Sequence, residues 1–154
     1  MADDTTAPSA ATEAEALNAA LAAEHAAVWG YGVVGAALPA DKQELAAASE
    51  NAHRDARDRL VELLAQRDTE PVGEQGAYEL PFPVLSEVDA AKLAVTLEDG
   101  VSAAYVRLLG EAAEPSTREL AVGTLGTTEV RAVAWRIRAK ETPVTEAFPG
   151  LPDR

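Results

Sequence analysis

The stretch that decides the fold is residues 17–38, LNAALAAEHAAVWGYGVVGAAL. Seven of its residues follow one another at alternating intervals of four and three: Leu17, Leu21, Glu24, Val28, Tyr31, Gly35 and Leu38. This alternation keeps one stripe of a helix facing its neighbours. The pattern therefore predicts a packed helix from about Thr12 to Leu38.

The same alternation returns in residues 88–109, VDAAKLAVTLEDGVSAAYVRLL. Its members are Val88, Ala91, Val95, Glu98, Ser102, Tyr105 and Leu109. In both stretches an acid precedes a tyrosine by seven residues, which places each pair on one helical face, two turns apart. The repeat predicts a helical bundle with an internal pseudo-twofold axis.

Turn and capping residues divide the chain into two helical hairpins. Pro39 ends the first helix, and Asp41 is predicted to cap a second helix that reaches about Arg67. Ser86 is predicted to cap the third helix. A fourth helix follows Gly110 and Pro115, beginning at Ser116 or Thr117 and ending near Lys140.

The segment between the hairpins, Asp68 to Leu85, lacks helical periodicity and is rich in proline and glycine. When extended it reaches roughly 50 Å, whereas a 25-residue helix is only about 38 Å long. It can therefore cross the whole bundle and let the second and third helices run parallel. We predict an all-α four-helix bundle with a long crossover, spanning residues 12–142, between a flexible segment 1–11 and a non-helical tail 143–154.

The composition of the chain excludes several kinds of site and partner. The 154 residues include no cysteine, which excludes disulfides, thiolate zinc sites and iron–sulfur clusters. The net charge of −13 argues against a nucleic-acid partner, because such binding depends on Lys and Arg. The N-terminal residues do not resemble a secretory signal, and no apolar run is long enough for a membrane span. We expect a cytoplasmic protein.

Acids inside the helical stripes are the most informative feature. Glu24 and Glu98 occupy positions where the pattern calls for apolar side chains, and a buried carboxylate must be protonated, paired or bound to a cation. Glu50 and His53 form a Glu-x-x-His pair on one face of the second helix. Glu129 is predicted to point inward on the face of the fourth helix that it shares with Val122, Leu125, Val133 and Ile137.

These residues resemble the ferritin-like superfamily, whose di-metal members use one Glu from each of two helices and Glu-x-x-His from each of the other two. Glu24 and Glu98 match the single acids, and Glu50 with His53 matches the first pair. Glu129 matches the acid of the second pair, but Ala132 stands where its histidine would be. The chain looks most like an actinobacterial branch of ferritin-like domains of unknown function, a likeness that its ending Ala-Phe-Pro-Gly, residues 147–150, strengthens.

The resemblance implies iron or manganese bound by Glu24, Glu50, His53, Glu98 and Glu129, and, if the protein is an enzyme, a metal-dependent oxidoreductase. The alternative is a non-catalytic bundle with a vestigial site and no metal. In that case Arg54, Arg57 and Arg131 are close enough in sequence to neutralise the acids.

Several residues near these acids have more than one interpretation. Tyr31 and Tyr105 either lie beside a metal or pack in the core with a hydrogen-bonded hydroxyl group. His25 is expected at a surface or interface, because it points about 100° away from Glu24.

The non-catalytic bundle would dimerise or bind a protein partner. A homodimer is expected because an alanine-rich bundle with few large core residues leaves an apolar face uncovered.

Overall fold

The computed structural model describes residues 7–152, in which the chain forms helices and no strand. The helices are α1 (Ala10–Ala36), the short 3₁₀ helix η1 (Ala40–Lys42), α2 (Glu44–Ala65), α3 (Glu87–Glu111) and α4 (Pro115–Ala139). The prediction of an all-α four-helix bundle is confirmed. Within the described residues, no helix combines the length and the apolarity that a membrane span needs.

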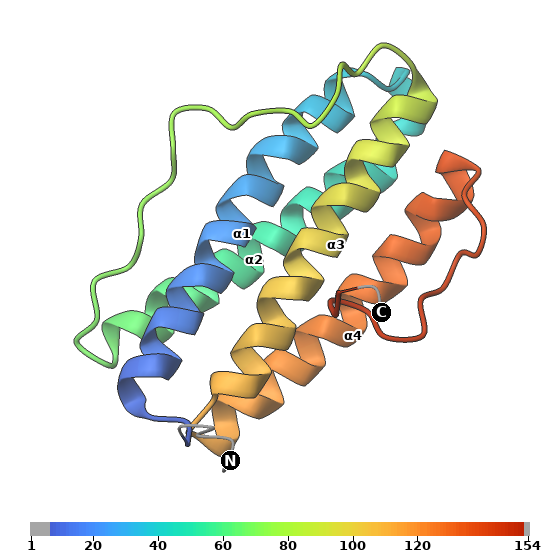
Figure 1. Cartoon of the computed structure of the whole chain (residues 1–154). Helices are drawn as coiled ribbons and strands as arrows, with labels where there is room; N and C mark the ends of the chain where they lie inside the picture. Colours follow the sequence, from blue (N-terminus) through green and yellow to red (C-terminus); the bar gives the residue numbers. More distant parts are fainter. Residues whose placement is uncertain (1–6, 153–154) are drawn as a thin grey trace.

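The connection between α2 and α3 determines the topology (Figure 1). α2 runs antiparallel to α1, and residues 66–86 then return along the outside of the bundle, so that α3 starts at the end where α2 started. α2 and α3 therefore run parallel, as predicted from the length of the crossover. α3 packs against both α1 and α4, and α1 also packs against α2.

Polar and aromatic residues of α1 hold the crossover in place. Asn18 accepts a hydrogen bond from the Val72 amide at 2.8 Å and donates one to the Glu70 carbonyl at 3.1 Å. A ring nitrogen of His25 lies 3.1 Å from the Val72 carbonyl oxygen. Further along α1, the ring of Trp29 lies 5.7 Å from that of Tyr78. The expectation that His25 lies at a surface is thus refined, because it contacts the crossover.

The ends of the helices agree only partly with the prediction. Ser9 and Thr12 form a reciprocal capping box, so α1 begins at Ala10 and not at Thr12. Ser86 caps α3 as predicted, because its hydroxyl oxygen accepts a hydrogen bond from the Asp89 amide at 3.1 Å. Asp41 does not cap α2, because η1 takes up residues 40–42 and α2 starts after them. Of the segment 1–11 that was predicted to be flexible, residues 1–6 lie outside the described part.

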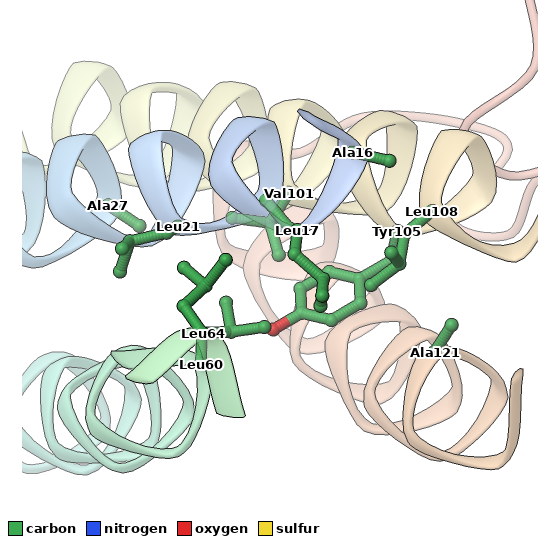
Figure 2. Packing of buried hydrophobic residues seen from close by; sticks show 11 residues of the cluster. Ala16, Leu17, Leu21, Ala27, Leu60, Leu64, Val101, Tyr105, Leu108 and Ala121 are labelled. Atoms are coloured by element: carbon green, nitrogen blue, oxygen red, sulfur yellow. The ribbon is translucent and has the colours of Figure 1, made fainter. Parts of the chain in front are cut away.

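The apolar core has two parts. In the first, Tyr105 of α3 packs among Leu17 of α1 and Leu60 and Leu64 of α2 (Figure 2). The second is built around Tyr31 and Trp135. Along α3, Glu98 lies between the residues of the second part, which end at Val95, and those of the first, which begin at Val101. We call the polar residues around Glu98, to which His53 joins Glu24, the polar layer.

The buried face of α4 differs from the predicted one. Val122 and Ile137 were expected in the core, yet they are 56% and 60% exposed. Trp135, which is fully buried, explains the difference. A helix turns about 100° per residue, so a residue two positions later points to nearly the opposite side. Small residues such as Ala121 and Ala132 line the buried face instead.

Glycines in α1 provide a first testable prediction. A Cβ added to Gly30 would lie 2.6 Å from Leu97 Cδ1, whereas one added to Gly32 would meet nothing within 4 Å. Gly32→Ala is therefore expected to raise the free energy of unfolding by about 0.5 to 1 kcal/mol, the usual gain for alanine inside a helix. Gly30→Ala should gain less, because Leu97 must move. Urea denaturation of both variants measures the difference, and equal gains would contradict a close approach at Gly30.

Candidate functional site

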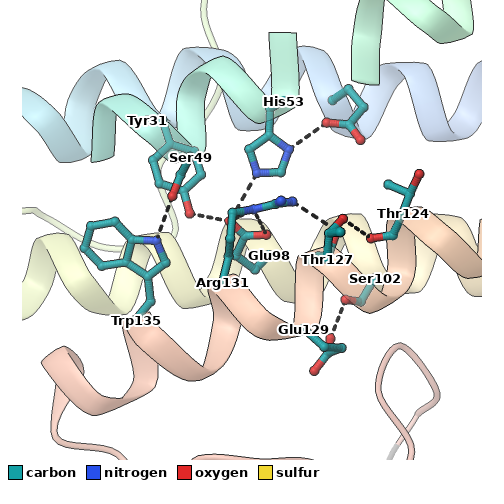
Figure 3. Close-up of polar contacts among 12 residues, drawn as sticks. Tyr31, Ser49, His53, Glu98, Ser102, Thr124, Thr127, Glu129, Arg131 and Trp135 are labelled. Atoms are coloured by element: carbon teal, nitrogen blue, oxygen red, sulfur yellow. Dashed lines mark hydrogen bonds and ion pairs between the residues drawn. The ribbon is translucent and has the colours of Figure 1, made fainter. Parts of the chain in front are cut away.

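Four charged residues, one from each helix, meet in the polar layer and form what we call the buried ion cluster (Figure 3). They are Glu24 of α1, His53 of α2, Glu98 of α3 and Arg131 of α4. The side chains of the first three have no exposed surface. Each lies on the inner stripe of its helix, so helix periodicity brings them to one level of the bundle.

Glu98 is the centre of the cluster. Its Oε1 accepts hydrogen bonds from the Tyr31 hydroxyl at 2.5 Å, from His53 Nε2 at 3.1 Å and from Arg131 Nε at 3.1 Å. Its Oε2 lies 3.2 Å from the same Arg131 nitrogen. Burial would raise the pKa of the Glu98 carboxyl, but the hydrogen bond and charge of His53, with the charge of Arg131, lower it overall.

His53 bridges the two acids. Its Nδ1 lies 2.7 Å from Glu24 Oε2, while its Nε2 faces Glu98. Burial alone would lower the pKa of the imidazole, but the hydrogen bonds to the two carboxylates and their charges raise it to about 9. His53 is therefore an imidazolium at neutral pH and donates from both nitrogens. Two carboxylates then face one imidazolium and one guanidinium, so the cluster is balanced in charge.

Aromatic rings surround the cluster on the Tyr31 side. The Tyr31 ring stacks on the His53 ring with centroids 5.3 Å apart, and Trp135 packs against Tyr31 at 6.0 Å. The Trp135 indole donates to Ser49 Oγ at 3.3 Å. Burial and the charge of Glu98 raise the pKa of Tyr31 well above its usual value. Tyr31 is thus a neutral donor that helps to hold Glu98.

Two of the five predicted ligand residues lie outside the cluster. Glu50 is paired with Arg54 at the bundle surface, because Ser49 takes the inner position on that turn of α2 and binds Trp135. Glu129 accepts a hydrogen bond from Ser102 at 2.5 Å and lies 3.6 Å from Arg136. Its displacement follows from the rotation of α4 described above.

The cluster does not fit a di-metal centre as its residues are arranged. Glu98 and both nitrogens of His53 are fully engaged, and among the described residues no group of three or more His, Asp or Glu side chains is placed to hold a metal ion. Glu24 Oε1 is buried without a hydrogen-bond partner in the described chain, but one free oxygen is too few for a carboxylate metal site. Metal binding at these five residues stays a prediction.

Two hollows of the molecule do not reach the three enclosed residues of the cluster. One hollow, of about 770 Å³, lies at the bundle end and is lined by residues that include Leu45, Val88 and Trp135. The other, of about 480 Å³, lies beside Trp29 and Tyr78. Neither is lined by Glu24, His53 or Glu98. A substrate bound in either hollow would not contact Glu24, His53 or Glu98.

A third buried acid, Glu13, was missed in the sequence analysis. It accepts hydrogen bonds from the amides of Ala113 and Glu114 and from the Thr117 hydroxyl, at 2.5, 2.8 and 2.7 Å, and forms an ion pair with Arg67. The carboxylate thus binds the turn that leads into α4 and a hydroxyl of the first turn of that helix, whose own N-cap residue makes no side-chain hydrogen bond. Its place four residues before the first leucine of the α1 stripe was the available signal.

Comparisons with known proteins identify a family but no activity. A family described as "Domain of unknown function (DUF4439)" matches residues 16–153. The crystal structure of a conserved hypothetical protein, rv2844, from Mycobacterium tuberculosis is similar, with a TM-score of 0.81 and 32% sequence identity over 84% of this chain and 98% of that one. No match was found among curated proteins.

Proposed function

Because the chain belongs to the DUF4439 family, whose description names no activity, we propose a function from its geometry: a non-catalytic helical bundle that works by binding a protein partner and needs no metal. In this interpretation the connectivity is that of ferritin-like bundles, and the buried ion cluster is a vestigial carboxylate site. Fold alone does not carry the proposal.

The observation that carries the proposal is the way in which Glu98 is held. Three donors, from Tyr31, His53 and Arg131, converge on one of its oxygens. A divalent cation bound to Glu98 would have to displace Arg131 or share the buried space with it, which adds positive charge to a cluster that is already balanced. The protein thus provides with its own cations what a metal provides in a di-metal bundle.

Metal analysis tests the proposal. Protein purified without chelator is expected to contain no stoichiometric iron or manganese, and its melting temperature should be the same with EDTA and with added Mn²⁺. An ion that binds only the folded protein would stabilise it. At a concentration 100 times its dissociation constant, the ion would add about 2.7 kcal/mol to the free energy of unfolding, which a melting curve detects readily.

Two variants make the test sharper. Arg131→Met removes the guanidinium that is paired with Glu98, so a metal ion could bind Glu98 in this variant without displacing a cation. Ala132→His restores the histidine that the di-metal pattern requires, at a fully buried position where a ring overpacks the core. Stoichiometric Mn²⁺ or Fe²⁺ binding by the unaltered protein, abolished by Glu24→Gln, would contradict the proposal.

A further inference from the structure

The outer face of α4 carries an apolar stripe that nothing in the described chain covers. Val122, Val130 and Ile137 are 56%, 73% and 60% exposed. They are spaced along the solvent side because Trp135 turns the opposite side of α4 inward. A soluble helix normally presents polar residues on this side, so three large apolar residues in one row indicate a contact surface.

Opposite charges stand at the two ends of the stripe. Glu119 lies one turn before Val122, and Lys140 follows Ile137 at the end of the helix. Both residues are exposed, and neither makes an ion pair within the part of the chain that the structure describes. The stripe is therefore acidic at one end and basic at the other, which suits a copy of itself that runs in the opposite direction.

Gly126 lies on this face between Val122 and Val130. A Cβ added there would meet nothing within 4 Å, so no contact inside the molecule requires a glycine. Glycine inside a helix costs about 0.5 to 1 kcal/mol relative to alanine. Within an apolar stripe, the missing side chain lets a second helix approach closely.

We propose that the stripe Val122–Gly126–Val130–Ile137 is a homodimer interface, in which α4 packs antiparallel against α4 of a second copy. This names the partner for the interaction role proposed above and rests on that role. Pairing the charged ends places Glu119 opposite the partner's Lys140. The same register sets Val122 opposite the partner's Ile137 and brings Val130 next to the twofold axis. Because the contact is isologous, each pairing occurs twice.

Sedimentation velocity over a range of micromolar concentrations tests the interface. The unaltered protein is expected to dimerise, and Val130→Glu should weaken dimerisation at least about tenfold, because two carboxylates would meet at the axis. Val72→Glu is the matched control, since Val72 is 41% exposed in the crossover, where its backbone contacts Asn18 and His25 of α1. It should leave the dimer unchanged. Both positions are exposed, so circular dichroism is expected to show folded protein in each case.

Charge exchange and glycine replacement test the register. Glu119→Lys and Lys140→Glu should each weaken the dimer, and the combined variant should restore it, because the ionic pairs are then re-formed with reversed signs. Gly126→Ala should weaken the dimer, whereas Gly32→Ala should not. A monomer at every concentration would overturn the dimer while leaving the metal-free interaction role intact. A dimer that is indifferent to Val130→Glu would overturn this interface.

Discussion

Glu98→Gln is expected to lower the free energy of unfolding by about 3 to 5 kcal/mol, the range found when one member of a buried ion pair is removed. The amide keeps the shape of the carboxylate but not its charge. His53 and Arg131 would then share a buried layer with Glu24 as the one remaining anion of the cluster. A buried positive charge without a counter-ion is the dominant cost.

Glu50→Gln is the matched control, because it makes the same chemical change at a carboxylate that pairs with Arg54 at the surface. Exposed pairs of this spacing contribute about 0.3 to 0.5 kcal/mol, so the variant should be nearly neutral. Urea denaturation at neutral pH measures both free energies. If Glu98→Gln cost no more than Glu50→Gln, the buried ion cluster would not be the charge-paired unit described here.

The stability of the protein is expected to fall as pH rises through the titration of His53. The pKa of His53 is raised from 6.5 to about 9 in the folded protein. A raised pKa means that the folded state holds the proton more tightly than the unfolded state does. The stabilisation is therefore complete below pH 6.5 and is lost as pH rises to about 9. The shift corresponds to about 3 kcal/mol.

His53→Gln should remove this dependence, so that its free energy of unfolding changes little between pH 6.5 and 9. His25→Gln is the control, because His25 contacts the crossover carbonyl of Val72 and no acid of the buried ion cluster. That variant should keep the slope of the unaltered protein. Equal slopes in all three proteins would show that another group is responsible and that His53 is not a buried imidazolium.

The sequence was sufficient for the secondary structure and much of the topology. Alternating intervals of four and three placed the stripes of α1 and α3 correctly, and the length of the crossover predicted that α2 and α3 run parallel. Both follow from local geometry, because helix periodicity and the reach of an extended chain do not depend on neighbouring elements. For the same reason Glu24, His53 and Glu98 were correctly assigned to the interior.

The rotation of α4 and the partners of each acid depended on the tertiary structure. α4 has residues of similar polarity on several faces, so its pattern left the inward side ambiguous, and the packing of Trp135 against Tyr31 decided it. That rotation moved Glu129 outward and brought Arg131 to Glu98. A single sequence does not show whether a buried carboxylate is neutralised by a cation from outside or by a guanidinium from another helix, because that choice depends on which side chains meet at one level of the bundle.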